Sequence, residues 1–179
     1  MTADDPVAAT RRWLQRAVIG LNLCPFAKAV QVKDQIRYVL SDATGVDALL
    51  ADLASELLWL HDADPDIVDT TLLIHPRALN DFHDYNDFLD QADAAIDALG
   101  LEGEIQIASF HPDYRFAGSA FDDVANCTNR SPFPMLHLLR EESIDRAVAA
   151  FPDPDAIVER NIATLERLGM DGYQRLLTD

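Results

Sequence analysis

The chain has 179 residues, of which 49% are hydrophobic, and its 14 Lys and Arg against 31 Asp and Glu give a formal net charge of −17. Such acidity argues against nucleic-acid binding, which needs a basic surface, and against docking on an anionic membrane. No hydrophobic run approaches the roughly 20 residues of a membrane-spanning helix, and the acidic residues 1–5 lack the features of a secretory signal. We therefore expect a cytoplasmic protein whose residues 1–5 are disordered and whose residues 6–179 form a single globular domain.

The N-terminal part predicts a helix, a β-hairpin and a second helix. Asp5 and Pro6 are typical of a helix start, and hydrophobic residues at helical spacing follow until Pro25 ends the helix. From 29 to 40, hydrophobic residues alternate on either side of a polar turn, which indicates two short strands. Leucines at helical spacing then predict a helix over about 46–60.

The middle of the chain predicts two strands with a helix between them. Residues 70–74, Thr-Thr-Leu-Leu-Ile, form a short and nearly continuous apolar run, as in a strand that is covered on both faces. Hydrophobic residues at helical spacing predict a helix over about 81–99, and residues 104–110 predict the next strand. An irregular stretch from 112 to 134 follows, and a stretch of this length in a compact domain is usually functional.

Two helices are expected to close the chain, over about 134–150 and 154–168, with Gly169 ending the second. The order of elements predicts an α/β fold, in which a small mixed sheet of three to four strands is covered by helices. A ferredoxin-like α+β arrangement is the alternative, because the hairpin at 29–40 would supply its extra strand.

Two histidines share one sequence context, since His75 and His111 each follow a predicted strand and precede a proline. If the two strands are parallel neighbours, both side chains lie on the sheet edge where open α/β sheets bind ligands. There they would bind a metal, shuttle a proton or hold an anion. Alternatively, each histidine caps its strand by bonding to nearby backbone.

Cys24 lies between the end of the first helix and Pro25. If Pro25 begins a short second helix, the thiol is near the positive end of that helix, which favours the thiolate. Cys24 is therefore a candidate nucleophile, and the alternative is a small buried hydrophobic residue. Cys127 is interpreted as a loop residue.

The segment 111–140 has three arginines and three aspartates, so the rest of the chain carries the whole net charge of −17. Arg130 and Ser131 precede a predicted helix start, where backbone amides bind anions. We therefore expect Arg130 and Arg140 to point into one anion pocket with His111 or His137. Alternatively, the arginines pair with acidic neighbours and the polar residues satisfy turns. The candidate ligand-binding residues are Arg115, Asn129, Arg130, Ser131, His137 and Arg140, with His137 and Arg140 on one helix face.

Several longer motifs carry a family resemblance: Leu23–Ala27, Thr70–Pro76, Asp87–Leu89, Gln106–Gly118, Thr128–Pro132 and Leu136–Glu141. Together they resemble a bacterial family, domain of unknown function 1415, over about Trp13 to Gly169. The resemblance implies membership of that family and transfers no activity, substrate or cofactor.

The hypothesis that follows is an enzyme for a small anionic metabolite. His75 and His111 would supply acid–base or metal-binding groups, Cys24 a nucleophile, and the arginine-containing segment 111–140 the anion site. The alternatives are a non-enzymatic module that binds a metal or a metabolite in the same pocket, and a structural protein in which these polar residues are buried.

Overall fold

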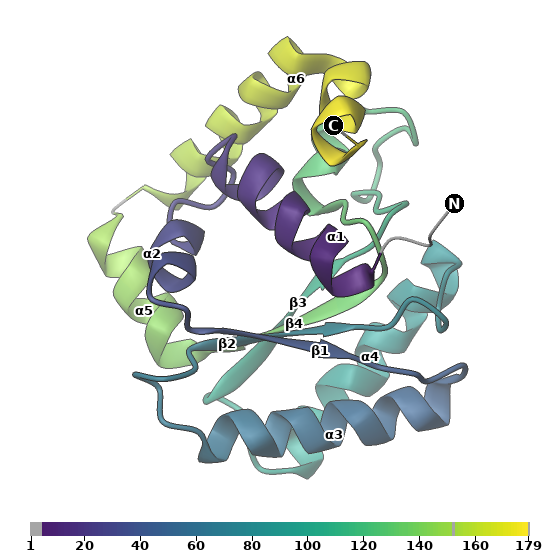
Figure 1. The fold of residues 1–179 in the computed structure, drawn as a ribbon, viewed down its shortest axis with the longest axis vertical. Helices are drawn as coiled ribbons and strands as arrows, with labels where there is room; N and C mark the ends of the chain where they lie inside the picture. The colour runs from purple at the N-terminus through teal and green to yellow at the C-terminus, as the bar shows by residue number, and fades with distance from the viewer. Residues whose placement is uncertain (1–4, 152, 179) are drawn as a thin grey trace.

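The computed structural model describes residues 5–151 and 153–178, so the expected disorder of residues 1–4 lies outside the described residues. Figure 1 shows helices on both sides of one sheet. The helices are α1 (Pro6–Trp13), α2 (Ala27–Val32), α3 (Val46–Asp62), α4 (Phe82–Ala98), α5 (Glu141–Ala150) and α6 (Pro154–Thr178), with a π-helical turn η1 (Leu14–Ile19) and a 3₁₀ turn η2 (Val124–Asn129). The strands are β1 (Ile36–Leu40), β2 (Thr70–Ile74), β3 (Ile105–Phe110) and β4 (Met135–Arg140).

The four strands form a mixed sheet in the order β1-β2-β4-β3. β1 and β2 are parallel, and β4 is antiparallel to both β2 and β3. The predicted α/β fold with a small mixed sheet is thus confirmed. The hairpin on which the ferredoxin-like alternative depended is absent, because residues 27–32 form helix α2 instead of a strand.

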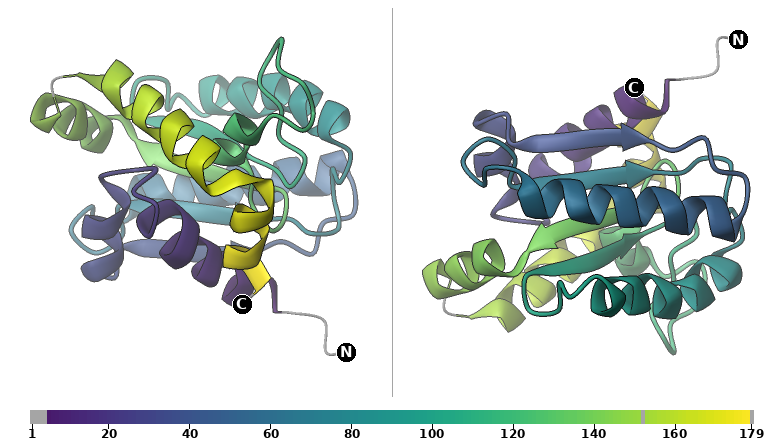
Figure 2. Two further views of the ribbon diagram at one scale, coloured as in Figure 1. Left: turned by 90° about the horizontal axis from the view of Figure 1, so that it is seen from above. Right: turned by 90° about the horizontal axis from the view of Figure 1, so that it is seen from below.

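The sheet separates two hydrophobic cores (Figures 1 and 2). Helices α3 and α4 cover one face, where their buried leucines and aromatic side chains pack on Leu73, Leu136 and Leu138. Segments α1, η1 and α6 cover the other face, where they pack on Leu72 and Met135. Residues of both central strands are therefore buried on both sides, as expected of a three-layer α/β fold.

The helix predicted over 134–150 is wrong in its first half, which is the central strand β4. A strand covered on both faces has hydrophobic residues at nearly every position, and its periodicity then does not distinguish it from a buried helix. β4 also continues directly into α5, with Arg140 as the N-cap residue, so no turn residue marks the boundary.

The C-terminal helix ends at Gly169 as predicted and then resumes. Gly169 has φ 71° and ψ 167°, a conformation that favours glycine, and it divides α6 into two helical segments that meet at a kink. The second segment, which the sequence analysis did not predict, places Tyr173 in the core, where its hydroxyl donates to the Arg130 carbonyl at 2.8 Å.

Candidate functional site

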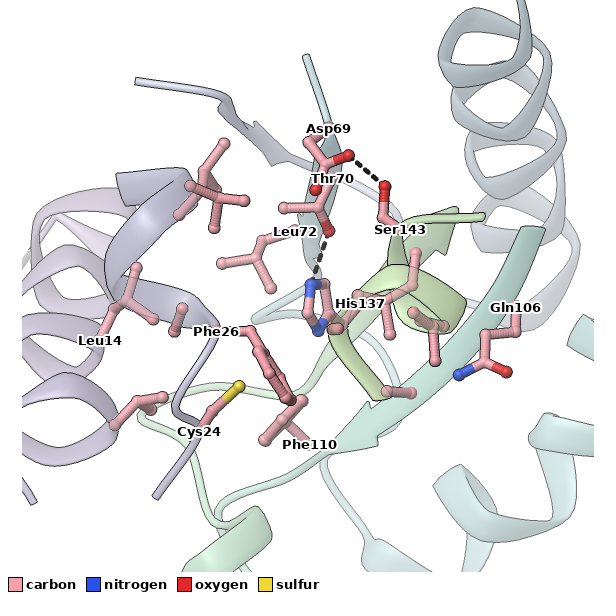
Figure 3. A pocket seen from close by; sticks show the side chains of 18 of the residues that line it. Leu14, Cys24, Phe26, Asp69, Thr70, Leu72, Gln106, Phe110, His137 and Ser143 are labelled. Carbon is pink, nitrogen blue, oxygen red and sulfur yellow. Dashed lines mark hydrogen bonds between the residues drawn. The ribbon is translucent and has the colours of Figure 1, made fainter. Parts of the chain in front are cut away.

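A cavity of about 370 Å³ lies on the α1 side of the sheet, against the end at which β2 begins and β4 ends (Figure 3). A cavity of this size is within the range of small-molecule sites. Its floor is the sheet and its walls come from α1, η1, α2 and α5. The lining residues include Trp13, Cys24, Phe26, Asp69, Thr70, Leu72, Gln106, Ala108, Phe110, His137, Ser143, Ile144, Ala147 and Val148.

Two walls of the cavity, α2 and α5, are helices that have no buried residue. The hydrophobic side chains of α5 that line the cavity are Ile144, Ala147 and Val148, and Val148 is 45% exposed. Hydrophobic side chains that remain accessible around a concave site are typical of a surface that a ligand covers.

His137 is the only histidine among the described lining residues, and its hydrogen bonds define which nitrogen carries the proton. Thr70 Oγ1 lies 2.6 Å from His137 Nε2 and donates its single proton to the Leu138 carbonyl at 2.7 Å. The hydroxyl therefore accepts from His137, and Nε2 carries the hydrogen. Burial lowers the pKa of His137 to about 4, so the ring is neutral at pH 7.

The second ring nitrogen of His137 is left as a free acceptor. Nδ1 faces the cavity, on the side of Phe26 and Phe110 (Figure 3), and no hydrogen bond to it is present within the described part of the chain. A neutral imidazole that donates through Nε2 carries a lone pair on Nδ1. The cavity floor thus presents one directed hydrogen-bond acceptor.

The remaining polar groups of the cavity carry little charge. Asp69 accepts a hydrogen bond from the Ser143 hydroxyl, which joins the start of β2 to helix α5 (Figure 3). Gln106 contributes a neutral amide. None of the described lining residues is Lys or Arg, and Asp69 is the only acidic one. The cavity therefore lacks the positive charge that an anion would need.

Cys24 lines the same cavity as His137 and is partly exposed. It lies in the turn between η1 and α2, and its carbonyl accepts from the Ala27 amide at 3.3 Å. Helix α6 holds this turn in place, since Asn161 Nδ2 donates to the Leu23 carbonyl at 2.8 Å. Helix α2 begins three residues after Cys24 and has only six residues, so it gives no strong reason to expect a thiolate at Cys24. Cys24 remains a candidate nucleophile because its thiol is accessible at the cavity.

His75 and His111 lie at the same end of the sheet, as predicted, but their strands are not neighbours. β4 runs between β2 and β3, which both run antiparallel to it. Both imidazole rings pack against Tyr85 in α4, with centroid distances of 5.9 Å for His75 and 5.0 Å for His111. They are thus on the α4 face of the sheet, separated from Cys24 and His137 by the sheet itself.

Both of these histidines bond to backbone near their strand ends. His111 Nδ1 accepts from the Asp113 amide at 3.0 Å, so Nε2 is the protonated nitrogen and donates to the Leu79 carbonyl. His75 Nδ1 donates to the Ala78 carbonyl at 2.9 Å, and its Nε2 is buried and has no hydrogen-bond partner among the described residues. Burial lowers the pKa of both rings, to about 4 for His75.

The predicted pocket shared by Arg130 and Arg140 is wrong. Arg130 precedes β4 and donates to the carbonyls of Tyr114 and Phe121, which orders the loop between them. Arg140 lies at the opposite end of β4, where it donates to the carbonyls of Ala63 and Val68 next to the end of α3. The partial negative charge at the C-terminal end of α3 also stabilises the Arg140 guanidinium there.

The other predicted ligand-binding residues next to Arg130 stabilise local backbone. Asn129 Nδ2 donates to the Ser109 carbonyl at 3.0 Å, and the Ser131 hydroxyl donates to the Phe133 carbonyl at 2.7 Å. The strand β4 follows them, so the expected helix N-terminus is absent. His137 and Arg140 also do not share a helix face, because residues three apart on a strand point to opposite faces.

Arg115 lines a second, smaller cavity of about 250 Å³ at the end of the sheet that carries His111. The charged or titratable lining residues there are Asp81, His83, Asp113 and Arg115. With two acidic groups against Arg115, this cavity does not favour an anion.

Thr70 and the walls of α5 were missed by the sequence analysis. A threonine that opens a buried strand was a signal, because a buried hydroxyl needs a hydrogen-bond partner. Nothing in the sequence indicated that α5 lines the cavity, since its residues were assigned to a helix that begins at 134.

We expect Cys24 to react with iodoacetamide at least about tenfold faster than Cys127 at pH 7.5, because a thiol reacts only where the reagent reaches it. Cys127 is 1% exposed, burial raises its pKa, and its sulfur lies 3.7 Å from Met170 Sδ. Mass spectrometry of tryptic peptides measures both rates, and Cys24→Ser identifies the signal. Modification of Cys24 only after denaturation would contradict its placement at the cavity.

Among residues 5–151 and 153–178, no three His, Cys, Asp or Glu side chains are grouped to hold a metal ion. No helix in this part of the chain is long and apolar enough to cross a membrane.

No curated protein and no solved structure matches the chain. A family model matches residues 5–175, nearly the whole sequence and including every residue of both cavities. The chain therefore belongs to the family described as "Protein of unknown function (DUF1415)".

Proposed function

We propose that the protein binds a small, largely apolar molecule in the cavity between the sheet and helices α2 and α5. The observation that carries this proposal is the directed acceptor, Nδ1 of His137, on the floor of a cavity with hydrophobic walls. Such a combination, a mostly apolar pocket with few oriented polar groups, is what small-molecule sites share.

This proposal replaces the expected anion pocket of histidines and arginines. The arginines Arg130 and Arg140 are bonded to backbone carbonyls far from each other, and the described lining of the cavity has no Lys or Arg. The net charge of −17 adds long-range repulsion of anions. An uncharged ligand needs no positive charge in the cavity and is not repelled by the net charge of the protein.

Thiol-dependent catalysis is the second candidate, and the placement of Cys24 in the same cavity favours it. In an ester substrate, the Cys24 thiolate would attack the carbonyl carbon and the C–O bond would break. The alcohol would leave with the thiol proton, and water would then hydrolyse the thioester to release the acid and restore the thiol. His137 would accept a hydrogen bond in such a reaction, but a pKa of about 4 makes it a weak base.

Filling the cavity tests the proposal. Ala147→Phe places a ring among the lining residues of α5, whereas Ala149→Phe makes the same change at an exposed position of that helix. With para-cresol as probe and ligand-observed NMR as readout, we expect Ala147→Phe to weaken binding at least about tenfold and Ala149→Phe to leave it unchanged. Equal binding by wild type and Ala147→Phe, or no binding to wild type, would overturn the proposal.

A further inference from the structure

We infer that the cavity selects uncharged ligands that carry a hydrogen-bond donor, such as a phenolic or alcoholic hydroxyl, and discriminates against acceptor-only and anionic ligands of the same shape. The inference rests on the proposed function, because it specifies the chemistry of the ligand for the same cavity.

The selection follows from a chain of three polar groups that starts at the backbone. The Leu138 carbonyl can only accept, so the Thr70 hydroxyl, 2.7 Å away, donates to it. The hydroxyl has no second proton, so it accepts from His137 Nε2, 2.6 Å away. Each step has one direction, and the chain therefore ends at an Nδ1 that accepts and cannot donate while the ring is neutral.

A ligand that enters the cavity removes water from Nδ1 of His137, so its affinity depends on whether it replaces the lost hydrogen bond. A ligand that covers Nδ1 with a hydroxyl forms a hydrogen bond, whereas an ether oxygen in the same place faces a lone pair and leaves both acceptors without a partner. A carboxylate adds a buried charge in a cavity whose described lining provides Asp69 but no cation. The order of affinity expected for one shape is donor, then acceptor, then anion.

The hydrophobic walls of the cavity favour a ligand that is apolar apart from its hydrogen-bond donor. Leu72 and Phe110 line the cavity beside His137 (Figure 3). Trp13 is a further lining residue, and Ile144 and Val148 line the cavity from α5. Gln106 provides the amide that can pair with a second polar group, at the far side of the floor from Cys24 (Figure 3). A small aromatic or aliphatic alcohol satisfies these surroundings.

Three probes of nearly one shape test the inference: para-cresol, para-methylanisole and para-toluate. By ligand-observed NMR titration at pH 7, wild type should bind para-cresol about tenfold tighter than para-methylanisole, the effect of one hydrogen bond, and para-toluate weakest. Equal affinity for para-cresol and para-methylanisole, or tightest binding of para-toluate, would overturn the inference while the proposed binding function stands. If no neutral probe binds, the proposed function itself fails.

Thr70 gives the matched variants. Thr70→Val removes the hydroxyl, so Nε2 no longer has to carry the proton and the preference for para-cresol should fall to within about threefold. Thr70→Ser keeps the hydroxyl and should keep the tenfold preference, which separates the hydrogen-bond chain from a general loss of packing. A preference that survives Thr70→Val unchanged would show that Thr70 does not fix the proton.

Discussion

Lowering the pH from 7 to 4.5 is expected to destabilise the folded protein by several kcal/mol through two histidines, the buried His75 and the partly buried His137. The pKa values of His75 and His137 are each lowered from 6.5 to about 4 by burial. Between these values the unfolded chain binds protons that the folded chain does not, so the free energy of unfolding falls as the pH decreases. One pKa unit corresponds to about 1.4 kcal/mol, which gives up to roughly 3 kcal/mol for each histidine.

Urea unfolding at pH 7, 5.5 and 4.5 measures this effect, and His137→Gln isolates one contribution. The variant should be less stable than wild type at pH 7, and the difference should shrink by roughly 2 kcal/mol or more at pH 4.5. His61→Gln is the control, because His61 is exposed and pairs with Glu104 at 2.7 Å. His137→Gln leaves every carboxylate of the protein in place, so parallel curves for wild type and His137→Gln would contradict the prediction.

Tyr85→Phe is expected to cost roughly 3 kcal/mol, although it removes one oxygen atom. The Tyr85 side chain is fully buried, and its hydroxyl donates to the Met135 carbonyl at 2.7 Å and accepts from the Phe110 amide at 3.0 Å. Without the hydroxyl, both backbone groups lose a partner at a place that water reaches poorly, and each costs about 1–3 kcal/mol.

The expected result has a local signature as well. Amide hydrogen exchange at Phe110 should become faster than exchange at the neighbouring positions of β3, because that amide loses its acceptor. Tyr114→Phe is the matched control, since no hydrogen bond of the Tyr114 hydroxyl is present among the described residues. A Tyr85→Phe protein as stable as wild type would mean that the two strand ends pair without the tyrosine.

The sequence correctly predicted those helices and strands whose hydrophobic pattern fits only one type of secondary structure. Leucines at helical spacing give α3, the aromatic and aliphatic stripe gives α4, and the short hydrophobic run gives β2. The prediction was wrong where one pattern fits both a helix and a strand. Val30 and Val32 fit a strand as well as the helix α2, and residues 135–140 fit a helix as well as the strand β4. Burial on both faces removes the period of β4, whereas the six residues of α2 are too few for a period to distinguish a helix from a strand.

The candidate site shows the same division. The sequence identified Cys24 and His137 as chemically capable residues, and placed His75 and His111 at one end of the sheet. It did not predict that the sheet separates these pairs, since this depends on β4 lying between β2 and β3. Strand order arises from the packing of residues far apart in the chain, and no local spacing records it.

By itself, the sequence determined the acidic surface charge, the α/β class, and which residue types are available for chemistry. Only the tertiary structure decided which of them meet. Arg130 and Arg140 became partners of backbone carbonyls at opposite ends of β4, whereas Thr70, 67 positions away in the sequence, became the partner that directs His137. The physical reason is that a buried polar group takes whichever partner folding places within about 3 Å, and that distance is set by the strand register and not by the sequence neighbourhood.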